Sequence, residues 1–390
     1  MPCRESRRWT IASRDVLKGV GAVALGAMVG ALPASQAPAS ATDALRWPPY
    51  RKTLAIDGLG GPGLFFYKDT DPEYAAELQA LRECGLGGAV TTVSSLSWLG
   101  DKAYRETKQR IEDWKAVIAR HPDLLLLVRT RADLDRAERE DKVGVIFTFQ
   151  GTEPLGEDAD RIAQFREQGV RVIQLTHNRR NLIGDGCMEP GNAGLSNYGH
   201  QVVERLNTEK MVVDLAHGSP RTIRESILAS RAPVLISHTG CRELVDAPRL
   251  VFDDNLKLLA DRGGVAGIIF WPYIRRQGQQ TSADVIRHIE HAVNVCGEDH
   301  VGIGTDLGIA PIEVTPEFVR DNTEMLKEMI AEGNFDQDRD PELFLFPPDL
   351  NMANRFEVLA AMLSARGHSE TRIAKILGGN FARVMGEVWG

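Results

Sequence analysis

The sequence of 390 residues is poor in cysteine and has no long hydrophobic run. Its five cysteines form no CxxC pair, which argues against a zinc ribbon or a thioredoxin-type redox motif. The most hydrophobic stretch near the N-terminus, residues 19–32, is too short to span a bilayer. No GxGxxG follows a strand pattern and no P-loop is present. Nothing in the sequence therefore indicates a nucleotide cofactor.

The first 41 residues have the composition of an export signal. Arg7 and Arg8 in "SRRWTI" precede the weakly hydrophobic stretch, and "APASA" then offers small residues for cleavage after Ala41. This pattern predicts a twin-arginine signal peptide over residues 1–41, a single mature domain over 42–390, and a periplasmic or secreted protein. Retention of the uncleaved segment as a membrane anchor is the alternative.

An excess of positive charge is also missing. The net charge is −8, and it becomes −11 once residues 1–41 are removed. An acidic chain of this kind argues against nucleic acid or an anionic membrane surface as the partner.

Short apolar runs alternate with amphipathic segments between residues 53 and 306. Most of the runs are continuously apolar, as expected for parallel strands that are covered on both faces. About eight repeats of strand and helix predict an α/β fold, a (β/α)8 TIM-type barrel, with a doubly wound sheet as the alternative. The nine runs cover residues 53–59, 87–93, 124–130, 143–150, 170–177, 211–217, 233–238, 264–271 and 301–306. The run at 124–130 is the one expected outside the barrel, and a helical extension is expected from about residue 310.

Titratable side chains stand at the ends of several predicted strands. "MVVDLAH" ends on His217 and "PVLISH" on His238, while His177 and Asp306 end two further runs. Residues at the C-terminal ends of barrel strands line the active site, so these side chains should meet. Two imidazoles suit a divalent metal such as zinc. Asp306 would then act as a ligand or general base, and His177 would stabilise an oxyanion.

From about residue 53 onward the chain resembles the membrane (renal) dipeptidase family, zinc-dependent metallopeptidases built on an amidohydrolase-type barrel. The resemblance is carried by "QLTHN", "GLSNYGHQVVERLN", "VVDLAHGS", "APVLISHTG", "VGIGTD" and "LGGNFARV". It implies that His217 and His238 hold the second of two zinc ions and that His177 contacts the scissile carbonyl. Arg249 would bind the substrate carboxylate, which suits the geometry of a guanidinium. A homodimer is also implied.

Three metal-holding positions of the family are altered. Leu59 and Gly61 stand where the family has a His-x-Asp pair, and Gln150 replaces its bridging glutamate. Two divalent ions about 3.5 Å apart repel by roughly 19 kcal/mol at an effective dielectric constant of about 20. Asp306 alone cannot offset this repulsion. We therefore expect at most one ion, held by His217 and His238 with Asp306 or the Gln150 carbonyl as third ligand.

The sequence thus predicts an exported, dipeptidase-like hydrolase that acts on dipeptides or a related small amide. Asp306 and His177 are its predicted catalytic residues, and Arg249, His177 and Gln150 are predicted to bind substrate. A non-hydrolytic protein that binds or matures a secreted peptide is the alternative, because metal ligands have been lost. Arg249 could also merely pair with Asp246, Asp253 or Asp254. His288 and His291, on an amphipathic helix, are expected to face solvent.

Overall fold

The computed structural model describes residues 45–95 and 98–390. The predicted signal peptide at 1–41 therefore lies outside the described residues. None of the helices within the described ranges combines the length and the apolar character that crossing a membrane requires.

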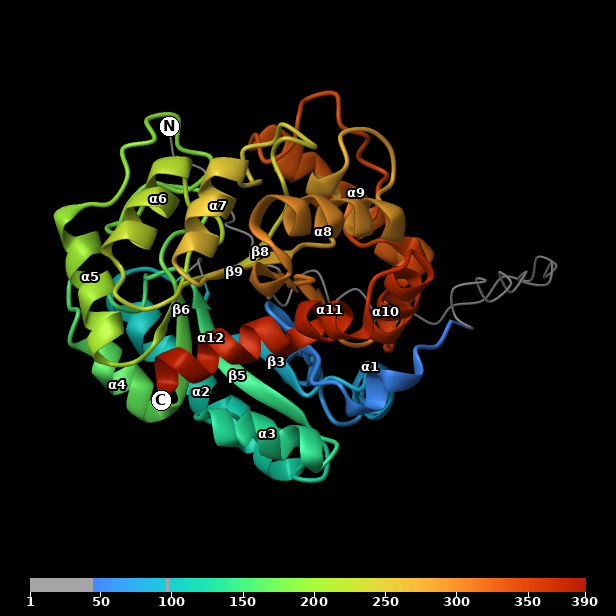
Figure 1. The fold of residues 1–390 in the computed structure, drawn as a ribbon. Helices are drawn as coiled ribbons and strands as arrows, with labels where there is room; N and C mark the ends of the chain where they lie inside the picture. The colour runs from blue at the N-terminus through green and yellow to red at the C-terminus, as the bar shows by residue number, and fades with distance from the viewer. Residues whose placement is uncertain (1–44, 96–97) are drawn as a thin grey trace, which may run out of the picture.

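Eight parallel strands form a nearly closed barrel surrounded by helices, which confirms the predicted fold (Figure 1). In order around the barrel they are β1 (Ile56–Asp57), β3 (Gly88–Thr92), β5 (Val143–Gln150), β6 (Val170–Gln174), β7 (Val212–Asp214), β8 (Leu235–Thr239), β9 (Val265–Ile268) and β10 (Val301–Ile303). The N–H of Gly58 donates to the carbonyl of Ile303 at 2.8 Å across the seam between β1 and β10. Beyond that point β2 (Gly60–Gly61) pairs with β11 (Leu307–Gly308).

The run at 124–130 lies outside the barrel, as predicted. It forms β4 (Leu125–Leu127), which pairs only with the first residues of β5, Val143 to Val145. β6 pairs with β5 from Phe147 onward. β4 therefore occupies the part of the β5 edge that β6 leaves open.

Helices cover the outside of the barrel. They are α1 (Pro72–Glu83), α2 (Gly100–Arg120), α3 (Arg131–Arg139), α4 (Arg161–Gln168), α5 (Asn197–Thr208), α6 (Pro220–Ala229), α7 (Asp253–Asp261) and α8 (Ser282–Cys296). The expected C-terminal extension contains α9 (Pro316–Ala331), α10 (Arg355–Ala365), α11 (Glu370–Ala374) and α12 (Asn380–Trp389).

The ring of Phe381 on α12 packs against glycines of the barrel strands. A Cβ atom built on Gly58 or Gly302 would lie 2.5 Å from this ring, and one on Gly267 would lie 3.0 Å from it. The missing side chains thus make room for an aromatic residue among buried strand residues such as Val212. This close packing anchors the C-terminal helix to the barrel.

Candidate active site

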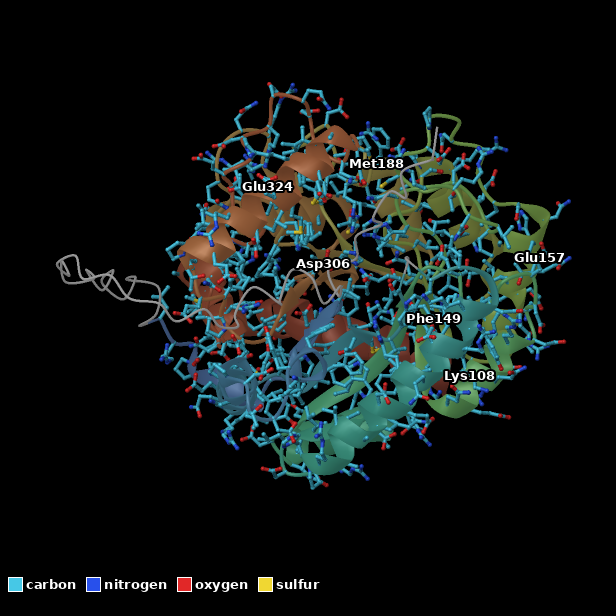
Figure 2. The ribbon with its side chains drawn as sticks, turned by 180° about the vertical axis from the view of Figure 1, so that it is seen from behind. Lys108, Phe149, Glu157, Met188, Asp306 and Glu324 are labelled. Carbon is cyan, nitrogen blue, oxygen red and sulfur yellow. The ribbon has the colours of Figure 1, made fainter. Side chains whose placement is uncertain are left out.

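The strand-end prediction places four side chains close together, and the structure does so. The rings of His177 and His217 stack with centroids 3.9 Å apart. Nε2 of His217 lies 3.0 Å from Nε2 of His238, which in turn lies 4.0 Å from Oδ2 of Asp306. Asp306 lies toward the middle of the molecule, whereas Glu157 lies at its edge (Figure 2).

The backbone is unusual at two of these positions. His217 has φ of 62° and Asp306 has φ of 59°, both in the left-handed region that residues with a side chain seldom adopt. Such conformations persist only where the surrounding structure enforces them, and they concentrate at functional sites. His217 lies three residues after the end of β7, and Asp306 lies three residues after the end of β10.

Two buried aspartates tie neighbouring strand ends together in the same way. Oδ1 of Asp214 accepts from the N–H of Ser237 at 2.9 Å, and its Oδ2 accepts from the Ser237 hydroxyl at 2.5 Å. Asp57 makes the equivalent bonds to the N–H and hydroxyl of Thr305, at 2.8 and 2.6 Å. Ser237 and Thr305 each directly precede a predicted site residue. The sequence did not predict these aspartate–hydroxyl hydrogen bonds, although Ser237 and Thr305 directly precede His238 and Asp306.

The hydrogen bonds of His238 determine which of its nitrogens carries a proton. The single hydroxyl proton of Ser237 is donated to Asp214, so Ser237 Oγ must accept from Nδ1 of His238, 2.8 Å away. Neutral His238 therefore has its lone pair on Nε2, the atom that faces His217.

His217 is held in the same tautomer. Its Nδ1 lies 2.7 Å from Oδ1 of Asn178, while Nδ2 of that amide donates elsewhere, to Asn334. Nδ1 of His217 is therefore the donor and Nε2 again carries the lone pair. Burial, and secondarily Arg249, hold the pKa values of His217 and His238 well below the usual range, so both rings are neutral. Two lone pairs 3.0 Å apart repel, and one cation between them would remove the repulsion. The histidine pair thus offers two ligands to a single divalent ion, and Asp306, an expected third ligand, lies 4.0 Å from Nε2 of His238.

Leu59, Gly61 and Gln150 occupy the positions where the resemblance implies three further metal ligands. Leu59 is buried and apolar. A Cβ atom on Gly61 would lie 2.3 Å from Oγ1 of Thr91, at a φ of 134°. Oε1 of Gln150 accepts from the Thr92 hydroxyl at 3.1 Å. Leu59 and Gly61 therefore offer no side-chain ligand, and the Gln150 oxygen, the alternative third ligand to Asp306, is hydrogen-bonded to Thr92.

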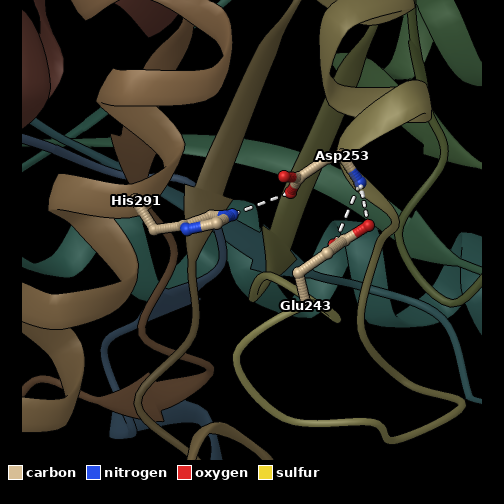
Figure 3. A group of neighbouring side chains, drawn as sticks. All are labelled: Glu243, Asp253 and His291. Atoms are coloured by element: carbon tan, nitrogen blue, oxygen red, sulfur yellow. Dashed lines mark hydrogen bonds and ion pairs between the residues drawn. The ribbon is translucent and has the colours of Figure 1, made fainter.

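Among the described residues, one group of at least three His, Cys, Asp or Glu side chains has donor atoms that all lie within 4.8 Å of one another. It consists of Glu243, Asp253 and His291 and lies outside the strand-end site (Figure 3). Nε2 of His291 bonds to Oδ1 of Asp253 at 2.8 Å. Both carboxylate oxygens of Glu243 accept from the N–H of Asp253, at 3.0 and 3.1 Å. These hydrogen bonds hold the first residue of α7 in place, and each of the three side chains takes part in at least one of them.

The expectation that His288 faces solvent is wrong, because its ring is completely buried. Its Nδ1 accepts from the N–H of Cys241 at 2.9 Å, and its Nε2 bonds to the carbonyl of Ile274 at 2.9 Å. His288 therefore joins two loops of the barrel as a core residue.

Asp306 and His177 have shifted pKa values that suit opposite roles. Burial raises the pKa of Asp306 to about 7, against a lowering effect of Arg249 and with a smaller raising effect of Asp57. Burial, followed by Arg249, lowers the pKa of His177 to about 3. At neutral pH Asp306 can therefore accept a proton, while His177 is a neutral imidazole that can donate a hydrogen bond.

Arg249 is buried beside these groups with unused hydrogen-bond donors. It is 3% exposed, and its Nη2 donates to the carbonyl of His238 at 2.8 Å. Its Nε and Nη1 are buried without a partner. The alternative that Arg249 pairs with a nearby aspartate is wrong. Asp246, Asp253 and Asp254 instead pair with Arg242, His291 and Lys257, respectively.

Aromatic residues stack beside the site. Tyr273 stacks on Trp271 with ring centroids 6.2 Å apart, and on Phe335 with centroids 4.4 Å apart. Nε1 of Trp271 donates to the backbone carbonyl of Asp306 at 2.9 Å. Sequence reasoning missed Phe335, because nothing in the sequence connects it to a strand end.

Comparison with known proteins supports the resemblance. Dipeptidase verJ of Clonostachys rogersoniana is 29% identical over 289 residues, which cover 74% of this chain and 66% of that protein. An uncharacterized dipeptidase of Schizosaccharomyces pombe is 29% identical over 300 residues, covering 75% of this chain and 65% of that protein. The chain thus spans just under two thirds of the length of these relatives.

Among solved structures, an amidohydrolase from Pseudomonas aeruginosa superposes with a TM-score of 0.74 at 28% identity, covering 88% of this chain and 98% of that one. The probable dipeptidase PvdM of the same species shares the fold, with a TM-score of 0.71 at 21% identity over 88% of this chain and 97% of that one.

The model of the family described as membrane dipeptidase (peptidase family M19) matches residues 65–339, which is more than half of the sequence. This match confirms the expectation drawn from the strand-end motifs. The chain belongs to the membrane dipeptidase family.

Proposed function

We propose that this protein hydrolyses the amide bond of a dipeptide, or of a related small amide that carries a free carboxylate, with one divalent ion held by His217 and His238. The observation that carries the proposal is the buried Arg249, whose Nε and Nη1 lack partners next to two imidazoles with opposed lone pairs. A buried cation with unused donors calls for an anionic ligand, because unpaired buried polar groups are costly.

The residues divide the chemistry among them. Arg249 binds the substrate carboxylate and so orients the amide bond. Asp306, with a pKa near 7, accepts the proton of the attacking water. His177 donates a hydrogen bond to the carbonyl oxygen as negative charge develops there. A zinc ion at the histidine pair would supply Lewis-acid activation of the water. The dipeptidase names of the curated relatives support this substrate class.

A second candidate is favoured by the altered half of the site. Leu59 and Gly61 offer no side-chain ligand and Gln150 carries no charge, whereas amide hydrolysis needs a strong activator. A protein that binds a secreted peptide without cleaving it would keep Arg249 and His177. Export by the twin-arginine route, supported by Arg7 and Arg8, is part of both proposals.

The test uses purified residues 42–390, with and without one equivalent of zinc. Release of amino acids from a dipeptide panel is measured by chromatography, and binding is measured by calorimetry. Zinc-dependent release that is lost in His217→Ala but kept in the matched control His291→Ala supports hydrolysis. Tight binding without release supports the second candidate. Neither release nor binding of any dipeptide would refute both.

A further inference from the structure

A chain of hydrogen bonds links the segment after α9 to His217. Oε2 of Glu332 accepts from Nδ2 of Asn334 at 3.3 Å. Oδ1 of Asn334 accepts from Nδ2 of Asn178 at 3.0 Å, and Oδ1 of Asn178 lies 2.7 Å from Nδ1 of His217. Glu332 and Asn334 are thereby connected to the imidazole of His217, although more than 110 positions of the sequence separate them from it.

The direction of this chain is set at its outer end. A carboxylate only accepts hydrogen bonds, so Asn334 turns its NH2 group toward Glu332 and its oxygen toward Asn178. Asn178 must then present its NH2 group to Asn334 and its oxygen to His217. The thiol of Cys187, 3.5 Å away, also donates to this oxygen. If Nδ1 of His217 lacked a proton, its lone pair would face the lone pairs of an oxygen.

The segment that carries Asn334 is docked on the barrel by independent contacts. Phe335 is buried and stacks on Tyr273, and Nη2 of Arg339 donates to the carbonyl of Pro272 at 2.6 Å. On the other side, Nη2 of Arg179 donates to the carbonyl of Glu332 at 2.9 Å. The segment 332–339 therefore bridges the loops that follow β6 and β9. Its position does not depend on the Asn334 side chain alone.

We propose that Asn334 is a positioning residue that acts through Asn178. It holds His217 in the tautomer with a proton on Nδ1 and the lone pair on Nε2, the form that can bind a divalent ion. Ser237 and Asp214 do the same for His238 from within the barrel. Outer partners of this kind orient metal ligands and change affinity by about tenfold to a hundredfold. The link to metal affinity rests on the proposed function, whereas the tautomer itself does not.

The first measurement uses the metal-free protein. Long-range ¹H–¹⁵N NMR of the imidazole nitrogens reports which nitrogen of His217 is protonated, after assignment with His217→Ala. We expect Nδ1–H in the wild type and in Asn334→Asp, which keeps the accepting oxygen. Asn334→Leu should show a mixture of tautomers. Gln337→Leu is the matched control, because Gln337 lies in the same segment but bonds only to the carbonyl of Ile330.

The second measurement is zinc affinity, obtained by competition with a chromophoric chelator. Asn334→Leu should bind zinc about tenfold more weakly than the wild type, while Asn334→Asp and Gln337→Leu stay within about twofold. An Nε2–H tautomer in the wild type would overturn the proposal, as would equal tautomers in the wild type and a folded Asn334→Leu. If the wild type binds no zinc and cleaves nothing, the proposed function fails, and the tautomer measurement still decides the role of Asn334.

Discussion

Replacing Arg249 by Ala should remove the ability of the site to distinguish a peptide acid from its amide. The guanidinium is 3% exposed and has two nitrogens without partners, so a bound carboxylate would be shielded from water. A charge-assisted hydrogen bond of this kind is worth about 1.5–3 kcal/mol, which corresponds to roughly a tenfold to hundredfold difference in affinity.

Calorimetry on the metal-free protein isolates this contribution, because the peptide is not consumed. A dipeptide and its C-terminal amide are titrated into the wild type, into Arg249→Ala and into Arg242→Ala. Arg242 is the matched control, since it follows the same strand but pairs with Asp246 at 2.8 Å. The acid should bind more tightly than the amide to the wild type and to the control, and equally well to Arg249→Ala.

Equal binding of acid and amide to the wild type would show that Arg249 does not bind the carboxylate, although its Nε and Nη1 have no other partner. Thermal unfolding of Arg249→Ala separates this result from loss of the fold. The variant should remain folded, since the Arg249 side chain makes one hydrogen bond, to the backbone carbonyl of His238.

Three further predictions concern pH, metal content and export. Burial raises the pKa of Glu77 in the folded protein to about 7. The contribution of this side chain to folding stability is fully present below the pKa that Glu77 has in the unfolded chain. It is lost as the pH rises through 7. Urea unfolding should therefore show stability falling between pH 4 and 8, by about 3 kcal/mol from this group, and less steeply in Glu77→Gln. Elemental analysis should find at most one zinc per chain, and Gly61→Asp should not add a second, because Thr91 Oγ1 occupies the space that its Cβ would need. Two tightly held ions in the wild type would contradict this. Replacing Arg7 and Arg8 by Lys should keep the precursor in the cytoplasm, as seen by fractionation and immunoblotting, and normal export would refute the twin-arginine assignment.

Local patterns along the chain were enough to predict the barrel and the core of the site. Continuous apolar runs are a local property, and parallel strands bring their C-terminal ends to the same rim. His217, His238 and Asp306 could therefore be expected to meet, and they do. The short spacing around residues 124–130 was likewise sufficient to predict that β4 lies outside the barrel.

How these residues are held, and what surrounds them, depends on contacts that form only in the folded chain. The tautomer of His217 depends on Asn334, and the aromatic stack beside the site includes Phe335. Both residues lie in a segment whose sequence has no pattern that points to the site. The unpaired state of Arg249 depends on where nearby aspartates find other partners. The burial of His288 depends on loops that cover one face of an amphipathic helix. Hydrogen bonds and packing between distant residues leave no periodicity in a sequence, and they appear only when the chain is folded.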